Sequence, residues 1–293
     1  MIKIQGLNKS FNDKEVLKNV DLTIKDGSVF GLVGINGSGK STLLRLISGV
    51  YQADSGEVII DGENVFENER IKRKVFFLPD EPYYNENVTP YTIKDIYKAF
   101  YKFDEEYYFK YLELFSIPIK KPINKFSKGM KRQVFIALAL AIKPKYLLLD
   151  EAFDGLDPLA RLTFKRALID MMEEKKTTII ISSHSLRELE DICDSYGLLD
   201  NKNVSSSGMI SDATENIHKY QVVFNEIVSK ENFDIKFKTY EQDGRIIKVV
   251  VEEDLETFTK IMEKYNPLII DEIAIDFEEL FMIEVKSRGY IND

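Results

Sequence analysis

One stretch of eight residues constrains this chain more than any other part of its sequence. Residues 34–41 read Gly-Ile-Asn-Gly-Ser-Gly-Lys-Ser, which matches the pattern G-x-x-x-x-G-K-[ST]. Residues 28–33 before it read as a buried strand, and residues 40–50 after it carry apolar side chains at helical spacing. Glycines let such a loop wrap closely around phosphate oxygens, and the following helix start adds partial positive charge. A purely structural Gly-rich turn is the alternative, but the flanking strand and helix favour a phosphate-binding loop.

The two side chains that end this loop, Lys40 and Ser41, are chemically suited to bind phosphate and a metal ion. Lys40 supplies a full positive charge between the outer phosphates of a bound molecule. The hydroxyl of Ser41 has the size and hardness of a Mg²⁺ ligand. The residues predicted to contact the phosphates are Gly34, Ile35, Asn36, Gly37, Ser38, Gly39, Lys40, Ser41 and Thr42.

Two adjacent carboxylates follow a second apolar strand. Residues 145–150 read KYLLLD, and Glu151 comes next. A buried strand would hold Asp150 at the carboxyl edge of the sheet, where ligands of open α/β sheets bind. We expect Asp150 to ligate Mg²⁺, and Glu151 to orient or deprotonate an attacking water. Such pairs are often only solvated helix starts, but this one ends a buried strand.

His184 follows a third apolar run, TTIIISS, at residues 177–183. A single histidine after a strand is more often structural than catalytic. Here the strand is predicted beside the phosphate-loop strand, so its end should reach the terminal phosphate. We therefore expect His184 to act as a hydrogen-bond donor that senses this phosphate.

One further segment distinguishes between classes of nucleotide hydrolase. Residues 126–133 read Phe-Ser-Lys-Gly-Met-Lys-Arg-Gln, which resembles the signature motif of ATP-binding cassette (ABC) ATPases. Residues 151–158, Glu-Ala-Phe-Asp-Gly-Leu-Asp-Pro, resemble the D-loop of that family and include Asp157. Together with the phosphate loop and the Asp-Glu strand, the resemblance covers roughly residues 1–210. A merely capped helix is the alternative reading of 126–133, because Ser127 is a good N-cap.

The resemblance implies that the chain hydrolyses ATP with Mg²⁺ as a head-to-tail dimer. In ABC ATPases the dimer closes on two ATP molecules, so the signature motif faces the γ-phosphate held by the partner. The signature residues carried over in this way are Ser127, Lys128, Gly129 and Met130.

Three further positions are assigned by the same resemblance. Phe11 stands where the family has an aromatic residue that stacks on adenine, although a core position is the rival interpretation. Asp80 occupies the place of a Gln that contacts Mg²⁺ and relays to the membrane partner. Asp is shorter and anionic but can ligate Mg²⁺, and the adjacent Glu81 could substitute for it.

The expected fold is an α/β P-loop ABC ATPase core with a mixed sheet and an inserted helical subdomain. We place this domain at 1–212, the helical subdomain at about 82–142, and a small α+β accessory domain at 213–293. The tail reads as strands at 220–225, 245–251 and 268–275, with helices near 254–265 and from 277. The net charge of −9 resides entirely in the tail, since residues 211–293 carry 19 acidic and 10 basic side chains.

Composition excludes several other classes of protein. The acidic balance argues against a general nucleic-acid binder. A single cysteine, Cys193, rules out an intramolecular disulfide and fits a reducing compartment. The longest apolar run, at 134–142, is too short to span a membrane, so another chain would supply the spanning part. The 12 aromatic residues within 83–115 predict either a packed helical face or a docking surface for another protein.

Our first hypothesis is the ATPase subunit of a microbial ABC transporter, cytoplasmic and peripheral on the inner face of the cell membrane. Its expected partners are a polytopic transmembrane subunit and a second ATPase subunit, in a homo- or heterodimer, and no nucleic acid. An exporter is favoured because Phe277-Glu278-Glu279-Leu280-Phe281 resembles the closing helix of bacterial type-two ABC exporters. Exporters of that branch carry antimicrobial or toxin peptides, antibiotics or lipids.

Two other hypotheses remain open at this point. A non-transport ABC ATPase would act on ribosomes or chromosomes, but such proteins carry two cassettes or long coiled coils, which this chain lacks. A regulatory P-loop GTPase is disfavoured because no N-K-x-D motif follows the phosphate loop.

Overall fold

The computed structural model of the chain describes residues 1–184, 189, 191–209, 217–275, 279 and 283. The chain forms two compact units, Met1–Ser207 and Gly208–Asp293. The boundary predicted at 212/213 lies outside the described residues. So does most of the predicted closing helix from 277, of which only Glu279 and Ile283 are described.

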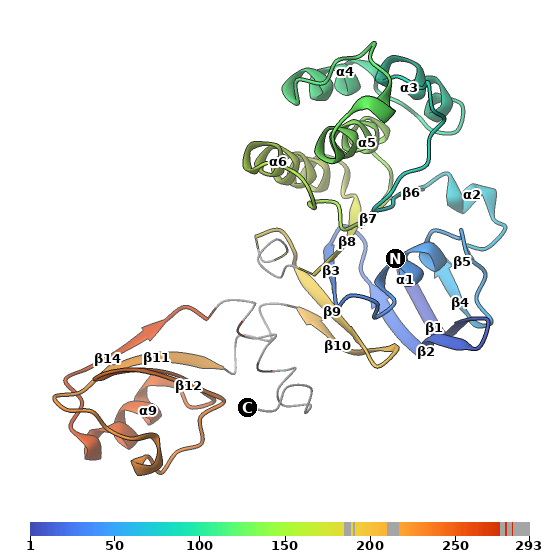
Figure 1. The fold of residues 1–293 in the computed structure, drawn as a ribbon. Coiled ribbons are helices and arrows are strands. Elements are labelled where there is room, and N and C mark those ends of the chain that lie inside the picture. Colours follow the sequence, from blue (N-terminus) through green and yellow to red (C-terminus); the bar gives the residue numbers. More distant parts are fainter. Residues whose placement is uncertain (185–188, 190, 210–216, 276–278, 280–282, 284–293) are drawn as a thin grey trace. The chain divides into compact units, whose positions relative to one another are not determined.

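A six-stranded sheet forms the centre of the first unit, in the order β10-β9-β3-β8-β7-β6 (Figure 1). Its strands are β3 (Val29–Val33), β6 (Val75–Leu78), β7 (Tyr146–Asp150), β8 (Thr178–Ser183), β9 (Ser195–Asp200) and β10 (Asn203–Met209). Strands β9, β3, β8, β7 and β6 run parallel to their neighbours. The register places Val33 opposite Ser183, and Ser182 opposite Asp150. The carboxyl ends of β3, β8 and β7 therefore meet at one edge, as predicted from their sequences.

A second, antiparallel sheet has the order β2-β1-β4-β5. Its strands are β1 (Ile2–Phe11), β2 (Lys14–Ile24), β4 (Ser55–Ile60) and β5 (Glu63–Asn64). Helix α1 (Lys40–Ile47) follows β3 of the central sheet, and helix α2 (Glu69–Lys72) follows β5. One hydrophobic core joins both sheets to α1, and it includes the fully buried Leu7, Leu43 and Tyr146. Burial of this apolar surface fixes α1 and the loop before it.

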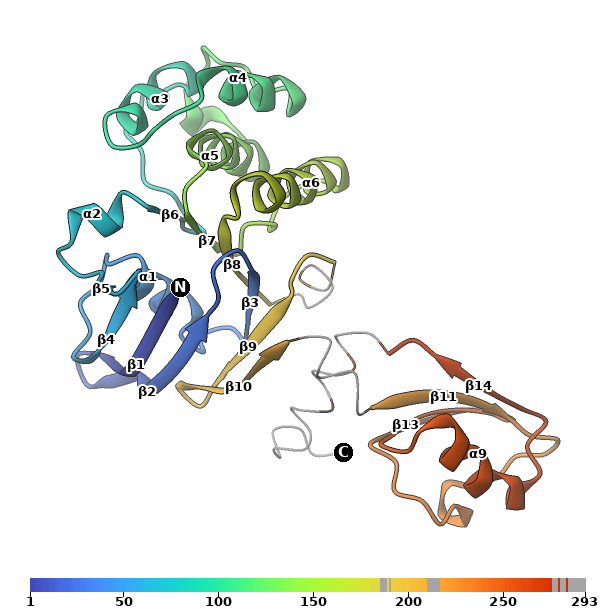
Figure 2. The ribbon, with the colours of Figure 1, turned by 180° about the vertical axis from the view of Figure 1, so that it is seen from behind.

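The remaining helices of the first unit form a separate layer, drawn in green in Figures 1 and 2. They are α3 (Pro90–Lys98), α4 (Glu105–Leu114), the short 3₁₀ helix η1 (Ile123–Lys125), α5 (Lys128–Ile142) and α6 (Pro158–Lys175). Helix α5 is buried from Arg132 to its end because it packs against α3, α4, α6 and β6. None of the helices in the described part of the chain has the length and apolar character needed to cross a bilayer.

The aromatic residues of this layer divide between core and surface. Tyr108 is 0% exposed and Tyr111 is 5% exposed, so these rings pack inside. Tyr83 is 89% exposed and Phe100 is 61% exposed, so these rings lie on the surface. The packed helical face therefore describes part of the segment, and a docking surface at the exposed rings stays a prediction.

The second unit contains a four-stranded antiparallel sheet in the order β12-β13-β11-β14. Its elements are β11 (His218–Val223), the 3₁₀ helix η2 (Lys230–Asn232), β12 (Thr239–Asp243), β13 (Ile246–Val251), α9 (Leu255–Met262), the 3₁₀ helix η3 (Glu263–Tyr265) and β14 (Ile269–Ile273). Strand β12 was not predicted, because its sequence TYEQD is polar, but it pairs residue by residue with β13. The ring of Phe258 on α9 stacks on Tyr220, with centroids 4.3 Å apart.

We predict that Phe258→Ala destabilises the second unit without affecting the first. The side chain is 0% exposed and belongs to the core of this unit. Its truncation should cost about 3–5 kcal/mol of unfolding free energy. Hydrogen exchange resolved along the chain measures each unit separately. Leu255→Ala, on the same helix but at a residue 42% exposed, is the control and should change little. Equal loss of protection in both units would contradict the prediction.

Candidate active site

The glycine loop between β3 and α1 is shaped by positions that exclude side chains. Gly37 and Gly39 have φ of 81° and 111°, which residues with a Cβ rarely adopt. A Cβ at Gly34 would lie 2.5 Å from the carbonyl oxygen of Leu199. Lys40 begins α1, and its Nζ donates to the carbonyl oxygen of Gly34 at 2.7 Å. The ammonium group therefore lies at the mouth of the loop, where phosphate oxygens would bind.

Three oxygen-bearing side chains meet behind this lysine. Asp150 Oδ1 accepts hydrogen bonds from Ser41 Oγ at 3.0 Å and from Ser182 Oγ at 2.7 Å. Asp150 is only 1% exposed, and its other oxygen, Oδ2, is buried and has no hydrogen-bond partner among the described residues. A buried carboxylate oxygen without a partner is costly unless a cation or donor binds it.

This donor set fits a magnesium ion. Mg²⁺ prefers oxygen ligands and is commonly held by one or two carboxylates together with substrate phosphates. Ser41 and Asp150 supply a hydroxyl and a carboxylate that already lie side by side. In the part of the chain that the structure describes, no group of three or more His, Cys, Asp or Glu side chains gathers. A cation here would therefore depend on phosphate oxygens for its remaining ligands.

Glu151 links the lysine to the predicted histidine. Its Oε1 lies 3.5 Å from Lys40 Nζ, and its Oε2 lies 2.9 Å from His184 Nδ1. The backbone of Glu151 is left-handed, with φ of 48°, and its N–H donates to Ser182. Residues with side chains are strained in this conformation and hold it where the surroundings enforce it. The strain turns the carboxylate toward Lys40 and His184, the arrangement expected of a residue that acts on water at the phosphate.

The signature segment forms the start of α5. The N–H of Met130 donates to Ser127 Oγ at 3.2 Å, which confirms Ser127 as the N-cap. A Cβ at Gly129 would lie 2.5 Å from the carbonyl oxygen of Gly155, so the helix start and the D-loop backbone touch. Lys128 and Asp154 form an ion pair at 2.7 Å, which raises the pKa of Lys128 and lowers that of Asp154.

The D-loop continues into another capped helix. Asp157 accepts hydrogen bonds from the N–H groups of Leu159 and Ala160, both at 3.0 Å, and so begins α6. The motifs at 126–133 and 151–158 thus form one continuous surface between two helix starts. Among the described residues, no hydrogen bond or ion pair joins Ser127, Lys128, Gly129 or Met130 to the phosphate loop.

In the structure, Asp80 pairs with a residue of the signature helix. Its carboxylate forms an ion pair with the guanidinium of Arg132, and Arg132 also donates to the carbonyl oxygen of Pro79 at 3.0 Å. No described hydrogen bond joins Asp80 to Ser41 or Asp150. Glu81 is exposed to solvent. The Mg²⁺ role assigned to this position thus stays a prediction.

Phe11 lies at the end of β1, and its ring is partly exposed. It is 40% exposed, so a core position does not describe it. The ring packs edge-on against Tyr51 with centroids 5.4 Å apart, and Lys9 Nζ lies 5.3 Å from its centroid. This arrangement leaves aromatic surface for the stacking role expected of Phe11.

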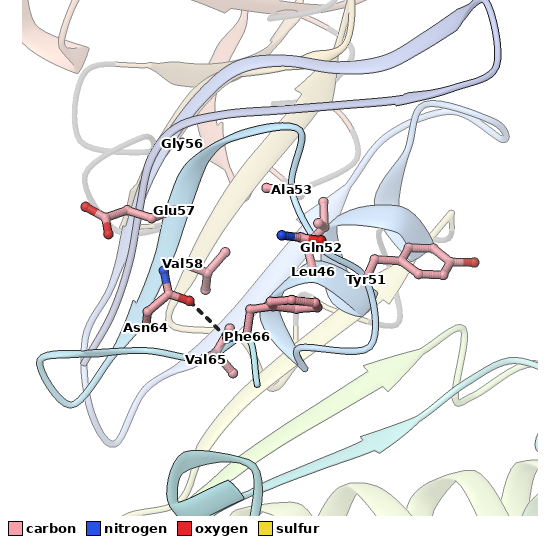
Figure 3. Close-up of a pocket in the computed structure, with 10 residues that line it drawn as sticks. All are labelled: Leu46, Tyr51, Gln52, Ala53, Gly56, Glu57, Val58, Asn64, Val65 and Phe66. Atoms are coloured by element: carbon pink, nitrogen blue, oxygen red, sulfur yellow. Dashed lines mark hydrogen bonds between the residues drawn. The ribbon is translucent and has the colours of Figure 1, made fainter. Parts of the chain in front are cut away.

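A separate hollow of about 260 Å³ lies beside the end of α1 (Figure 3). Tyr51, Gln52 and Phe66 are among its lining residues, whereas Lys40, Asp150 and Glu151 are not. The side-chain oxygen of Asn64 is already bonded to the N–H of Phe66. Tyr51 both lines this hollow and packs against Phe11, but the hollow is separate from the charged groups around Lys40.

Sequence analysis missed three residues that support the site. Ser182 bonds Asp150 and Glu151 at once, and the only sequence signal was its place in the SSH run before His184. Arg132 binds the Asp80 segment, and Tyr51 supports Phe11. These two contacts join segments far apart in the sequence, so no local pattern indicates them.

Comparison with known proteins agrees with this geometry. A family model described as ABC transporter matches residues 17–154. Another, described as AAA domain, putative AbiEii toxin, Type IV TA system, matches residues 120–190. The ABC transporter ATP-binding protein YtrB of Bacillus subtilis (strain 168) is 30% identical over 289 residues, 98% of this chain and 99% of YtrB. The chain belongs to the ABC transporter family of ATP-binding proteins.

A second relative and a solved structure support the same family assignment for the ATP-binding part of the chain. The lantibiotic transport ATP-binding protein SrtF of Streptococcus pyogenes is 34% identical over 201 residues, 68% of this chain and 86% of SrtF. A solved ATP binding subunit of an ABC transporter aligns with a TM-score of 0.66 at 28% identity, covering 73% of this chain and 91% of that subunit. The predicted ABC ATPase fold and ATP hydrolase class are confirmed, while the roles of single residues stay predictions.

We predict that Lys40→Ala weakens ATP binding to the cassette by about 2–4 kcal/mol, because it removes a charge-assisted contact to phosphate. Calorimetric titration of the purified chain with ATP measures this. Lys25→Ala, at an exposed lysine outside the loop, is the control. Unchanged affinity in Lys40→Ala would refute the placement of the phosphates.

We also predict that Gly129→Ala lowers ATP turnover about ten-fold or more, because the new Cβ would press on the backbone of Gly155. ATP affinity of the isolated chain should change little, since the phosphate loop is untouched. Gly208→Ala is the matched control, because a Cβ there meets nothing within 4 Å. Steady-state phosphate release measures turnover, and wild-type rates in Gly129→Ala would contradict the proposed close contact.

Proposed function

We propose that this chain is the ATP-hydrolysing subunit of an ABC exporter and works as a dimer closed by ATP. The observation that carries the proposal is the position of Glu151, bonded to His184 and paired with Lys40 beside the partnerless oxygen of Asp150. A charged nucleotide, a cation and a water-activating carboxylate would meet at this point.

ATP binding begins at the glycine loop. The N–H groups of the loop and of the start of α1 converge on the phosphates, and Lys40 adds its charge. Lys40 Nζ contacts the carbonyl oxygens of Gly34 and Ile35 and the carboxylate of Glu151, and phosphate oxygens would replace the weaker carbonyl acceptors. The partly exposed ring of Phe11 stacks on adenine.

Ser41 and Asp150 would hold Mg²⁺ through Oγ and the free Oδ2. The cation neutralises charge on the outer phosphates when it is bound. Ser182 keeps Asp150 oriented by its hydrogen bond to Oδ1.

Hydrolysis then requires a group that accepts a proton from the attacking water. Glu151 is placed for this role, because its carboxylate lies beside the lysine that holds the phosphates. His184 fixes the carboxylate through Nδ1, and its other ring nitrogen is the expected donor to the γ-phosphate. The same strained backbone that orients Glu151 thus couples it to His184.

The second half of the site would come from another copy. Ser127 caps a helix whose start can bind an anion, and this start does not contact the phosphate loop of its own chain among the described residues. The phosphate loop and the start of α5 in one chain would each form half of a nucleotide site. These halves favour a head-to-tail pair, as a homo- or heterodimer, that closes over two ATP molecules. Hydrolysis would reopen the pair.

The direction and cargo of transport are inferred from relatives. SrtF is named for lantibiotic transport, which supports export and antimicrobial peptides as cargo, with antibiotics and lipids as the other candidates. The membrane-spanning path would belong to a polytopic partner subunit. Exposed rings of the helical layer, such as Tyr83 and Phe100, offer that partner a docking surface. The chain would then act on the inner face of the cell membrane.

We predict that Glu151→Gln still binds ATP but accumulates as a closed dimer, because the closed state forms and cannot hydrolyse its nucleotide. Light scattering after gel filtration in ATP and Mg²⁺ measures the dimer. Glu173→Gln, which removes a carboxylate outside the site, is the control and should remain like wild type. Wild-type ATP turnover by Glu151→Gln would show that Glu151 is not the base.

A further inference from the structure

We propose that Asp80 is a positioning residue, which holds the signature helix α5 to the end of β6 through Arg132 and does not ligate Mg²⁺. The expected effect on ATP turnover rests on the proposed function. The contact itself is a property of the chain alone.

The first observation is the environment of Arg132. Its side chain is only 2% exposed, although a guanidinium always carries its charge. One of its nitrogens, Nη1, donates to the carbonyl oxygen of Pro79 at 3.0 Å, and the other, Nη2, binds the carboxylate of Asp80. Because a buried charge without its partner is strongly unfavourable, Arg132 holds the two residues of this segment in place.

The second observation is what the contact connects. Pro79 and Asp80 follow β6 directly, and β6 pairs in parallel with β7, the strand that ends at Asp150. Arg132 lies five residues after Ser127 on the same helix. Helix α5 also packs against β6 and is buried from Arg132 to its end. A shift of the Asp80 segment therefore shifts the signature end of α5.

The third observation concerns the alternative role. Ser41 and Asp150 are joined to one another, whereas the carboxylate of Asp80 is engaged by a buried guanidinium. Ligation of a cation by Asp80 would break this ion pair and remove the carboxylate that balances the buried charge of Arg132. A neutral Gln, which ABC ATPases usually carry here, could not balance a buried guanidinium. The acidic residue at 80 and the arginine at 132 are therefore interpreted as a matched pair.

The test compares Asp80→Ala, Arg132→Gln and the double variant in the full-length chain. Arg166→Gln is the matched control, because it removes one guanidinium from an exposed position of helix α6, outside the motifs of the site. Three quantities are measured: thermal stability without nucleotide, ATP turnover, and the Mg²⁺ concentration that half-saturates ATP binding. Arg132→Lys provides a milder variant that keeps the charge if Arg132→Gln does not fold.

We expect both single variants to lower the melting temperature, and the double variant to lower it by clearly less than their sum, as coupled neighbours do. Both should reduce kcat about ten-fold through a misplaced signature helix. The half-saturating Mg²⁺ concentration should stay within about two-fold of wild type, because Asp150 and Ser41 are intact. Arg166→Gln should match wild type in all three measurements.

Additive losses of stability would overturn the proposed pair. A large rise in the Mg²⁺ requirement for Asp80→Ala, absent in Arg132→Gln, would show that Asp80 is a metal ligand. The stability measurement needs no nucleotide, so it tests the pair even if wild-type chain proves inactive with ATP. An inactive wild type would instead contradict the proposed function.

Discussion

A buried lysine ammonium organises the candidate active site of this protein. Lys40 Nζ lies between the carbonyl oxygen of Gly34 and the carboxylate of Glu151, and its side chain is 6% exposed. Such a charge is tolerated only where acceptors surround it. The glycine loop supplies carbonyl oxygens, and the neighbouring strands β8 and β7 bring Ser182, Asp150 and Glu151 to the same edge. In the proposed function, this positive charge sets where the phosphates bind and where water is activated.

The helical layer adds a second feature, the start of α5, whose role the glycine loop and Lys40 cannot replace. The start of α5 is a capped helix N-terminus, held against the D-loop by the close approach of Gly129 to Gly155 and by the ion pair of Lys128 with Asp154. Its attachment to the sheet layer passes through Arg132 and Asp80. The molecule thus separates the group that holds the phosphates from the group proposed to cover them. In the proposed function, ATP would couple this arrangement to the closing and opening of two chains.

Much of the site could be predicted from the sequence, because each motif directly follows a strand of a parallel sheet. Asp150 ends β7 and His184 follows β8, so local apolar runs were enough to place both at one edge. Ser182 was missed because its role depends on the register of β8 with β7. Arg132 was missed for a similar reason, since its partner lies 52 residues away.

Elements of the fold could also be predicted only where a local apolar pattern marks them. The helix near 254–265 was predicted from its periodic apolar residues, and the structure begins α9 at Leu255. Strand β12 carries no apolar alternation and exists because its backbone pairs with β13. The aromatic segment at 83–115 gave no unique answer, because rings serve equally well in the core, as Tyr108 does, and at the surface, as Tyr83 does.

A crystal structure of the hydrolysis-deficient Glu151→Gln chain with ATP and Mg²⁺ tests the account most directly. The account predicts that each γ-phosphate contacts Lys40 of one copy and the Ser127 and Gly129 end of α5 from a second copy. A structure in which ATP fills the glycine loop while the start of α5 in every neighbouring copy points elsewhere would contradict it.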